Sequence, residues 1–269
     1  MLIHKKPFAD LRYFLSVVNP LMPRIRMKED LCGMSLYAYK RDVVGRNIFK
    51  TGMYDPTLSK WLIERFGDKG GNFIDIGANL GYFTCLLAKL AGPSGRVIAI
   101  EPEPANLALL KTNVAANGLE QVVKIFPVAL GATEGTATLN LYKNSNRGRH
   151  SLLSTGSGEQ VMVPLTTLDA LVDKSLLSGA AIDFVKMDVE GYEPYVMQGA
   201  PQTLDRVRYM NMEYAPYLLR KSGANLPEFL SQLAKKFSRI SRMHPDGMAP
   251  ITVPAILEQE DAFDLLFEK

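Results

Sequence analysis

The sequence predicts an α/β protein whose core is a doubly wound, mostly parallel sheet, preceded by an extension made of a helix and a hairpin. After the pair Gly70 and Gly71, short apolar segments alternate with segments of helical spacing. Such alternation is typical of parallel strands joined by crossover helices. The 269 residues, 47% of them hydrophobic, suffice for one large domain or two small ones. The change of pattern leads us to divide the chain into an extension, residues 1–70, and a main domain, residues 71–269.

The extension is expected to contain a short helix and a small hairpin. Residues 11–18 are mostly apolar, but Arg12 interrupts them, which favours a short amphipathic helix over a signal peptide. Weak contact of this helix with a membrane surface is a second interpretation. Residues 34–39 and 47–49 alternate like the two strands of a hairpin.

The main domain is expected to begin with strands and helices in strict alternation. The predicted strands are residues 73–76, 96–100 and 122–126, and the predicted helices are 82–90 and 104–116. Residues 136–142 alternate, and a polar loop follows over about 141–158. The remaining predicted elements are strands at 161–165, 183–189, 208–213 and 263–267, a helix starting near Thr167 and a helix at 227–237.

Composition limits which partners and which compartment we expect for the protein. The net charge of +3 gives no indication of a nucleic-acid partner. No segment approaches the roughly 20 continuous apolar residues that a membrane-spanning helix needs. Cys32 and Cys85 form neither a disulfide framework nor a metal-ligand spacing, so we interpret both as reduced thiols of a cytoplasmic protein. The oligomeric state is left open.

A glycine turn follows the first predicted strand of the main domain. Gly77 and Gly81 let the backbone approach a ligand, and Glu101 ends the second strand where a nucleoside-binding fold presents an acid to ribose hydroxyls. A dinucleotide-binding turn prefers a third glycine, and Asp75 would repel a pyrophosphate. S-adenosylmethionine carries a sulfonium and an ammonium, so Asp75 favours it over NAD. An NAD-dependent oxidoreductase remains the alternative.

The strand at 183–189 carries charges at every second position. Lys186, Asp188 and Glu190 therefore share one face, and both acids lie at the carboxyl end, where open α/β sheets bind ligands. Asp188, Glu190 and Glu213 are candidate catalytic groups, and the same three are candidate ligands for Mg²⁺. Lys186 is interpreted first as their counter-ion. His150 is a general base or an exposed loop residue.

Several separated motifs resemble the FkbM-type methyltransferases, which are class I enzymes that use S-adenosylmethionine. The motifs are FIDIGANLGY at 73–82, IEP at 100–102, TLD at 167–169, VKMDVEGYE at 185–193 and Gly199-Ala200, followed by Glu213. The resemblance covers about residues 34–268. It implies a Rossmann-like, seven-stranded sheet with the last strand antiparallel. It also implies cofactor contacts within the first two motifs, for which the candidates are Asp75, Gly77, Ala78, Asn79, Gly81, Glu101 and Pro102.

The sequence thus predicts an S-adenosylmethionine-dependent O-methyltransferase that acts on a hydroxyl of a small polar acceptor. The resemblance implies a sugar, a glycoconjugate or a natural product. No Asn-Pro-Pro-Tyr or Asp-Pro-Pro-Tyr motif follows the strand at 183–189, and no cysteine lies near Asp188, which disfavours methylation of amide nitrogens and of pyrimidine carbons. A binding module without turnover would require an eroded cofactor turn, and this turn is intact.

Overall fold

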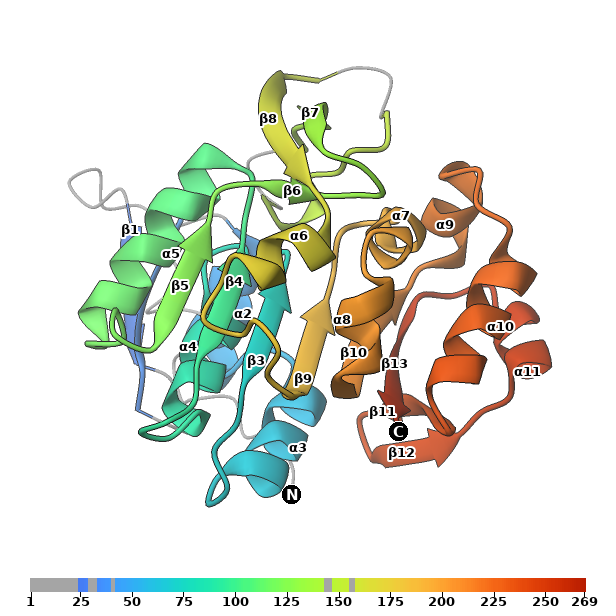
Figure 1. The fold of residues 1–269 in the computed structure, drawn as a ribbon. Helices are drawn as coiled ribbons and strands as arrows, with labels where there is room; N and C mark the ends of the chain where they lie inside the picture. Colours follow the sequence, from blue (N-terminus) through green and yellow to red (C-terminus); the bar gives the residue numbers. More distant parts are fainter. Residues whose placement is uncertain (1–23, 29–32, 40–41, 143–146, 155–157) are drawn as a thin grey trace.

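The described residues form a large eight-stranded sheet at the centre of the protein, and its strands are labelled in Figure 1. The computed structural model describes residues 24–28, 33–39, 42–142, 147–154 and 158–269. The strand order is β12-β11-β13-β10-β9-β3-β4-β5. These strands are β3 (Phe73–Ile76), β4 (Val97–Ile100), β5 (Val123–Phe126), β9 (Ile182–Met187), β10 (Val207–Tyr214), β11 (Arg239–His244), β12 (Gly247–Pro250) and β13 (Phe263–Glu268).

The five strands from β10 to β5 are parallel, and β13 runs antiparallel to both of its neighbours, β10 and β11. The predicted doubly wound, mostly parallel sheet with an antiparallel last strand is therefore confirmed. The predicted number of seven strands was too low by one. After β11 the chain turns back tightly, and its partner β12 adds an eighth strand at the edge of the sheet. The elements had not been predicted from pattern because β11 carries Arg239, Arg242 and His244 among its apolar residues.

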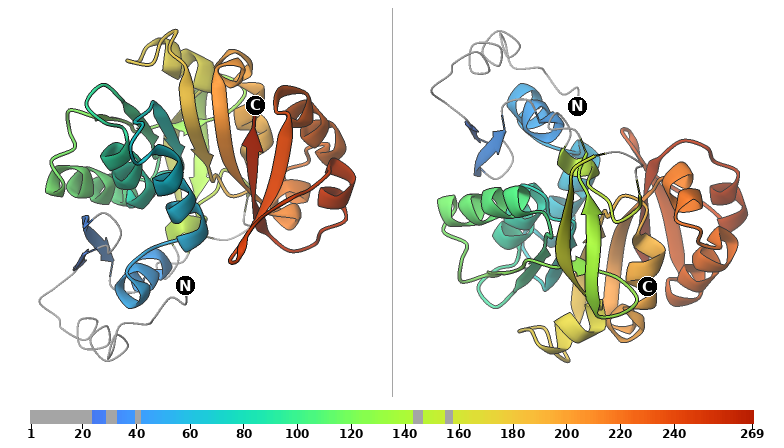
Figure 2. Two further views of the ribbon diagram at one scale, coloured as in Figure 1. Left: turned by 90° about the horizontal axis from the view of Figure 1, so that it is seen from below. Right: turned by 90° about the horizontal axis from the view of Figure 1, so that it is seen from above.

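Helices cover both faces of the sheet (Figure 2). On one face lie α2 (Val43–Thr51), α3 (Pro56–Phe66), α4 (Tyr82–Leu90) and α5 (Pro104–Ala116). On the other lie α6 (Leu168–Asp173), α7 (Glu193–Gln198), α8 (Pro201–Asp205), α9 (Pro216–Lys221), α10 (Leu226–Lys236) and α11 (Val253–Leu257). The predicted helices at 82–90 and 104–116 match α4 and α5. No helix in the described ranges is long and apolar enough to cross a membrane.

Alternate residues of the central strands enter the two separate cores. Phe73 and Phe184 pack with α3 and α4, whereas Ile74 and Val185 pack with the helices of the opposite face. This alternation follows from the period of two along a strand and explains why buried parallel strands are apolar on both sides. Cys85 is buried in the first core, and burial raises the pKa of its thiol to about 12.

The described part of the extension starts with a hairpin of β1 (Arg24–Lys28) and β2 (Ser35–Tyr39). The prediction of a hairpin strand at 47–49 was wrong, because these residues lie in α2, whose first turn is capped by the carboxylate of Asp42 accepting from the Gly45 N–H at 3.2 Å. The predicted helix at 11–18 and Cys32 lie outside the described residues. Asn113 of α5 holds β2 by bonding both backbone groups of Tyr37, at 2.6 and 3.0 Å.

An aromatic cluster joins the extension to the sheet. The ring of Trp61, on α3, lies 5.3 Å from that of Tyr209 and 5.8 Å from that of Phe184, between ring centroids. Phe66 packs edge to face on Phe73 at 5.0 Å. Residues of the extension therefore share one core with the main domain. The division at residue 70 stays a prediction about chain organisation.

A second, three-stranded sheet stands over the carboxyl ends of the parallel strands (Figure 1). It consists of β6 (Ala129–Leu130), β7 (Gly135–Asn140) and β8 (Gln160–Thr166), in the order β6-β8-β7. The segment between β7 and β8 contains the short 3-10 helix η1 (Arg147–Arg149). The described part of the predicted polar loop therefore lies at the end of the large sheet where ligands bind in open α/β folds.

Candidate active site

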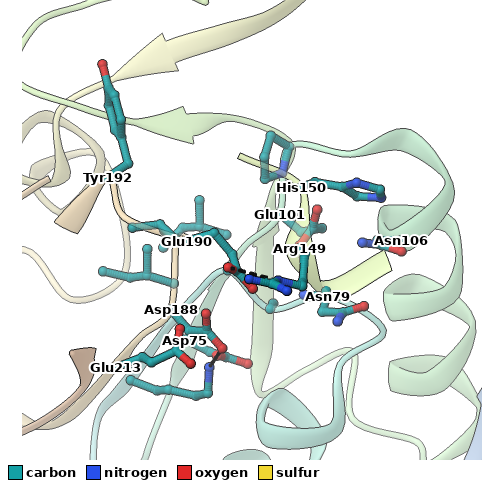
Figure 3. A pocket seen from close by; sticks show the side chains of 18 of the residues that line it. Asp75, Asn79, Glu101, Asn106, Arg149, His150, Asp188, Glu190, Tyr192 and Glu213 are labelled. Atoms are coloured by element: carbon teal, nitrogen blue, oxygen red, sulfur yellow. Dashed lines mark hydrogen bonds and ion pairs between the residues drawn. The ribbon is translucent and has the colours of Figure 1, made fainter. Parts of the chain in front are cut away.

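A cavity of about 330 Å³ lies at the carboxyl ends of β3, β4, β9 and β10. This volume falls within the range of small-molecule sites. Figure 3 shows the acids Asp75, Asp188 and Glu213 together on one side of it and Glu101 on the other. Of the residues predicted to bind cofactor or to act in catalysis, those that line the cavity are Asp75, Gly77, Ala78, Asn79, Glu101, Pro102, His150, Asp188, Glu190 and Glu213.

Gly81 is the predicted cofactor contact that does not line this cavity. It precedes α4 in the left-handed conformation, with φ at 91°. A Cβ there would lie 2.6 Å from the side chain of Leu110 on α5. The structure thus places Gly81 where α4 and α5 pack closely, between the cavity-lining residues Leu80 and Tyr82.

Asp75 brings a buried carboxyl to the middle of the cavity wall. Its side chain is fully buried, and Oδ2 accepts from the Thr84 hydroxyl at 2.6 Å. Among the described residues, Oδ1 has no hydrogen-bond donor. Burial raises the pKa of this carboxyl. A buried acid with one unused oxygen beside a cavity is a place where a cationic group binds favourably.

Glu101 is fixed at the end of β4 by two backbone donors. Its Oε2 accepts from the Asn79 N–H at 2.7 Å, and its Oε1 accepts from the Glu103 N–H at 2.9 Å. Burial raises the pKa of this carboxyl to about 7, although the two N–H groups act in the opposite direction. Each carboxylate oxygen has a further lone pair for the hydroxyls of a ligand.

The turn after β3 closely approaches the end of β9. Gly77 has φ at 77°, and a Cβ on it would lie only 1.9 Å from the backbone oxygen of Asp188. A side chain here would separate the two strand ends. Glycine at this position therefore keeps the glycine turn and the acidic strand end on the same cavity.

The loop after β9 aims the acidic side chains. Glu190 is a non-glycine residue with φ at 51°, followed by Gly191 with φ at 93°. Glu193 braces the loop, since its Oε1 accepts from the N–H groups of Val189 at 3.1 Å and Gly191 at 3.3 Å. A left-handed backbone at a residue other than glycine persists only when its surroundings hold it, and such strain is concentrated at functional sites.

Asp188, Glu190 and Glu213 form a cluster in which one carboxylate oxygen of each lies within 4.8 Å of the others. Burial, and then the charge of Asp188, raise the pKa of Glu190 to about 8 and that of Glu213 to about 9. Lys186 Nζ lies 3.2 Å from Asp188 Oδ2. The structure therefore brings together the three acids that the sequence proposed as catalytic groups or metal ligands.

Lys186 is placed as a counter-ion. Its side chain is 8% exposed. Burial alone would lower its pKa, but the charges of Asp188 and Asp75 outweigh burial and raise it. The ammonium therefore keeps its proton at neutral pH. The sequence interpretation of Lys186 as the partner of the acidic cluster agrees with this geometry.

His150 faces the cavity with a fixed ring. Its Nδ1 accepts from the Tyr142 N–H at 2.8 Å, so in the neutral ring the proton is on Nε2. In this tautomer Nε2–H is available to donate to a ligand, and the lone pair on Nδ1 is already engaged. The arrangement suits orientation of a ligand better than removal of a proton.

Arg149 is a cavity residue that sequence reasoning missed. Its Nε lies 3.8 Å from Glu190 Oε2, and its guanidinium donates to the Tyr217 hydroxyl and lies 5.4 Å from the ring centroid of Tyr142. Figure 3 shows the guanidinium beside Glu190 within the cavity. Tyr54 from the extension also lines the site. No periodic signal marks either residue, because Arg149 lies in the single short turn of η1 and Tyr54 lies between α2 and α3.

The sheet order, the antiparallel β13 and a cavity of this kind at the carboxyl ends define a Rossmann-like class I methyltransferase fold. The family model of the methyltransferase FkbM domain matches residues 75–237, more than half of the chain. The chain belongs to this family, and the resemblance drawn from its motifs is confirmed.

Similar proteins include "Methyltransferase sdnD" of Sordaria araneosa, which is 27% identical over 156 residues, covering 48% of this chain and 60% of that protein. Methyltransferase FkbM of Methylobacillus flagellatus KT is 17% identical with a TM-score of 0.46, covering 74% of this chain and 43% of that one. An O-methyltransferase of Bacillus cereus in complex with SAH is 16% identical with a TM-score of 0.46, covering 80% of this chain and 82% of that one. The chain thus spans less than two thirds of the curated relative.

Proposed function

We propose that the protein is an S-adenosylmethionine-dependent O-methyltransferase that acts on a hydroxyl of a small polar acceptor, in the class of sugars, glycoconjugates or natural products. The observation that carries the proposal is the pairing, in one cavity, of buried Asp75 with its unused oxygen and Glu101 with its fixed carboxylate. The first suits a cationic group and the second suits a ribose diol. S-adenosylmethionine presents both.

The residues present fit this cofactor. Glu101 would accept from its ribose hydroxyls, and Asp75 would face its cationic amino acid end. When bound, the cofactor supplies a methyl group on a sulfonium, and sulfur keeps the electron pair of the broken bond. A pyrophosphate of NAD would bring negative charge against Asp75, which disfavours the oxidoreductase alternative.

The acidic cluster supplies the base in this proposal. Glu190 and Glu213 have raised pKa values, so either carboxylate accepts a proton readily once it is ionised. One of them takes the proton of the acceptor hydroxyl as its oxygen forms the bond to the methyl carbon. Asp188, paired to Lys186, orients the acceptor. His150 donates a hydrogen bond rather than serving as base, because its Nδ1 is occupied.

Mg²⁺ is the second candidate for this cluster. Three carboxylate oxygens within 4.8 Å are of the type that Mg²⁺ prefers. However, Lys186 already neutralises Asp188 at 3.2 Å, and a divalent ion would face this ammonium. We therefore propose transfer without a metal. We also propose that the protein acts in the cytoplasm, which the free, buried thiol of Cys85 supports.

The test begins with thermal unfolding in the presence of S-adenosylhomocysteine or NADH. A ligand at 100 times its Kd stabilises the folded state by about 2.7 kcal/mol, and we expect this from S-adenosylhomocysteine alone. Protection by NADH alone would refute the proposal.

Transfer from labelled S-adenosylmethionine to a panel of hydroxyl compounds tests the chemistry. Asp188→Asn should lower transfer by about 10²-fold, because the acceptor is no longer oriented, while binding of S-adenosylhomocysteine persists. Asp173→Asn, at an exposed position of α6, is the matched control. Turnover of the Asp188 variant near the wild-type rate would show that the acidic cluster has been assigned wrongly.

A further inference from the structure

A second cavity, of about 380 Å³, lies beside the candidate active site. One side is formed by the extension, from Asn47 in α2 to Pro56 at the start of α3. The other side is formed by the sheet, through residues of β9, β10 and β13. The residues that line both cavities are Tyr54, Phe83, Lys186, Asp188 and Glu213. A molecule in the second cavity would therefore meet the same acids that border the cofactor cavity.

The second cavity is strongly acidic. Four carboxyl groups line it, from Asp55, Asp188, Glu213 and Asp264, and Lys186 is its single lining cation among the described residues. Because Lys186 pairs with Asp188 at 3.2 Å, three acids have no cationic partner in the lining. Their hydrogen bonds come from neutral donors where such bonds exist.

Two of these acids lie at the side away from the cofactor cavity, since they do not line it. Asp55 Oδ1 accepts from the Leu58 N–H at 3.1 Å, and Asp264 Oδ1 accepts from Asn211 Nδ2 at 3.2 Å. Burial, and then the charge of Asp55, raise the pKa of Asp264 to about 7. Burial likewise raises the pKa of Asp55. The charge of Lys186 acts in the opposite direction on both groups but does not outweigh burial.

We propose that the second cavity is the acceptor subsite and that it takes an alcohol carrying an amino group, with the ammonium between Asp55 and Asp264 and the hydroxyl at Glu213. This assignment rests on the proposed function and adds the class of acceptor to it. The ammonium supplies the missing cation at the far side of the cavity. The hydroxyl reaches the wall that the two cavities share, where the methyl group is transferred.

The chain offers conservative variants for this subsite. Asp55→Asn removes the charge and retains the N-cap of α3, because Asn caps helices as well as Asp does. Asp264→Asn retains an amide oxygen that can accept from Asn211. Asp261→Asn makes the same change at an exposed position three residues earlier and is the matched control. Circular dichroism and thermal unfolding establish that each variant folds.

The experiment is calorimetric titration of the full chain saturated with S-adenosylhomocysteine. The probes are two pairs that differ by one amino group, glucosamine with glucose and serinol with glycerol. We expect the amine of at least one pair to bind about tenfold tighter than its neutral partner or better. Asp55→Asn and Asp264→Asn should each reduce this preference about tenfold, whereas Asp261→Asn should leave it unchanged. The affinity for S-adenosylhomocysteine should be the same in all four proteins.

Equal affinities within both pairs, or no binding of either amine, would overturn the inference when S-adenosylhomocysteine still binds. Tight binding of Mg²⁺ that Asp264→Asn abolishes would also overturn it, by assigning the cavity to a metal ion. Absence of S-adenosylhomocysteine binding would instead refute the proposed function, on which the inference depends. Titration of the protein with S-adenosylhomocysteine, done before the amines are added, therefore distinguishes the two failures.

Discussion

Gly77→Ala tests whether the approach of the glycine turn to the end of β9 builds the site. The new Cβ would lie 1.9 Å from the backbone oxygen of Asp188, whereas ordinary van der Waals contact requires about 3.5 Å, so the two backbones must separate by roughly 1.5 Å. Alanine in the left-handed region costs about 1–2 kcal/mol, and forcing an atom into packed structure costs about 1–3 kcal/mol more. We therefore expect a loss of about 2–5 kcal/mol in the free energy of unfolding.

Gly118→Ala is the matched control. Gly118 also has a positive φ, 66°, but a Cβ there meets nothing within 4 Å. It should lose only the conformational part, about 1–2 kcal/mol. Urea unfolding measures both losses, and calorimetry with S-adenosylhomocysteine should show weaker binding for Gly77→Ala alone. Equal losses of stability in the two variants, with unchanged ligand affinity, would refute the reasoning.

Four further predictions concern the charged residues. Glu101→Gln should weaken S-adenosylhomocysteine binding about 10-fold to 100-fold in calorimetry, because the neutral amide is a poorer acceptor for a diol. Lys186→Met should lower the free energy of unfolding in urea by about 1–3 kcal/mol, because Asp188, whose side chain is 35% exposed, loses its counter-ion. The pKa of Glu190 is raised from 4.5 to about 8, so its contribution to stability is lost as pH rises through this window. Glu190→Gln should therefore flatten the pH dependence of thermal unfolding, by up to about 5 kcal/mol. Methyl transfer should persist in EDTA.

Two exposed positions on or near α5 serve as controls for the first two of these variants. Glu120→Gln and Lys111→Met make the same chemical changes in contact with solvent. Both should match the wild type in ligand affinity and stability. For the last two, a Glu190→Gln profile that parallels the wild type would contradict the assigned burial, and loss of transfer in EDTA, restored by Mg²⁺, would assign the acidic cluster to a metal.

Much of the fold follows from local pattern. The glycine turn, the helices α4 and α5 and the strand β9 could be predicted because each buries a regular apolar face next to a recognisable turn or cap. The hairpin partner of β2 could not, because residues 47–49 alternate over too short a stretch to be distinguished from one helical turn. Asp42 decides the matter by capping α2. The strand β12 is fully exposed, so it has no buried apolar face from which a strand could be predicted.

The candidate site divides in the same way. Asp75 lies near the end of β3, and Glu101 and Asp188 directly follow β4 and β9. The carboxyl ends of parallel strands meet at one edge of the sheet, so the convergence of these acids could be predicted. Arg149 comes from the short helix η1 and Tyr54 from the connection between α2 and α3, and only the tertiary structure brings them to the cavity. The orientation of His150 involves a hydrogen bond from the Tyr142 backbone, which no sequence pattern encodes.

The aromatic cluster around Trp61 has a consequence for the order of folding. Trp61 is synthesised early, but its ring packs on Tyr209 and Phe184, which leave the ribosome much later. Closure of α3 onto the sheet is therefore a long-range event that has to wait for most of the chain. Because the sequence contains one tryptophan, the fluorescence of Trp61 reports this single docking step, and a refolding trace would time the arrival of the extension without any added label.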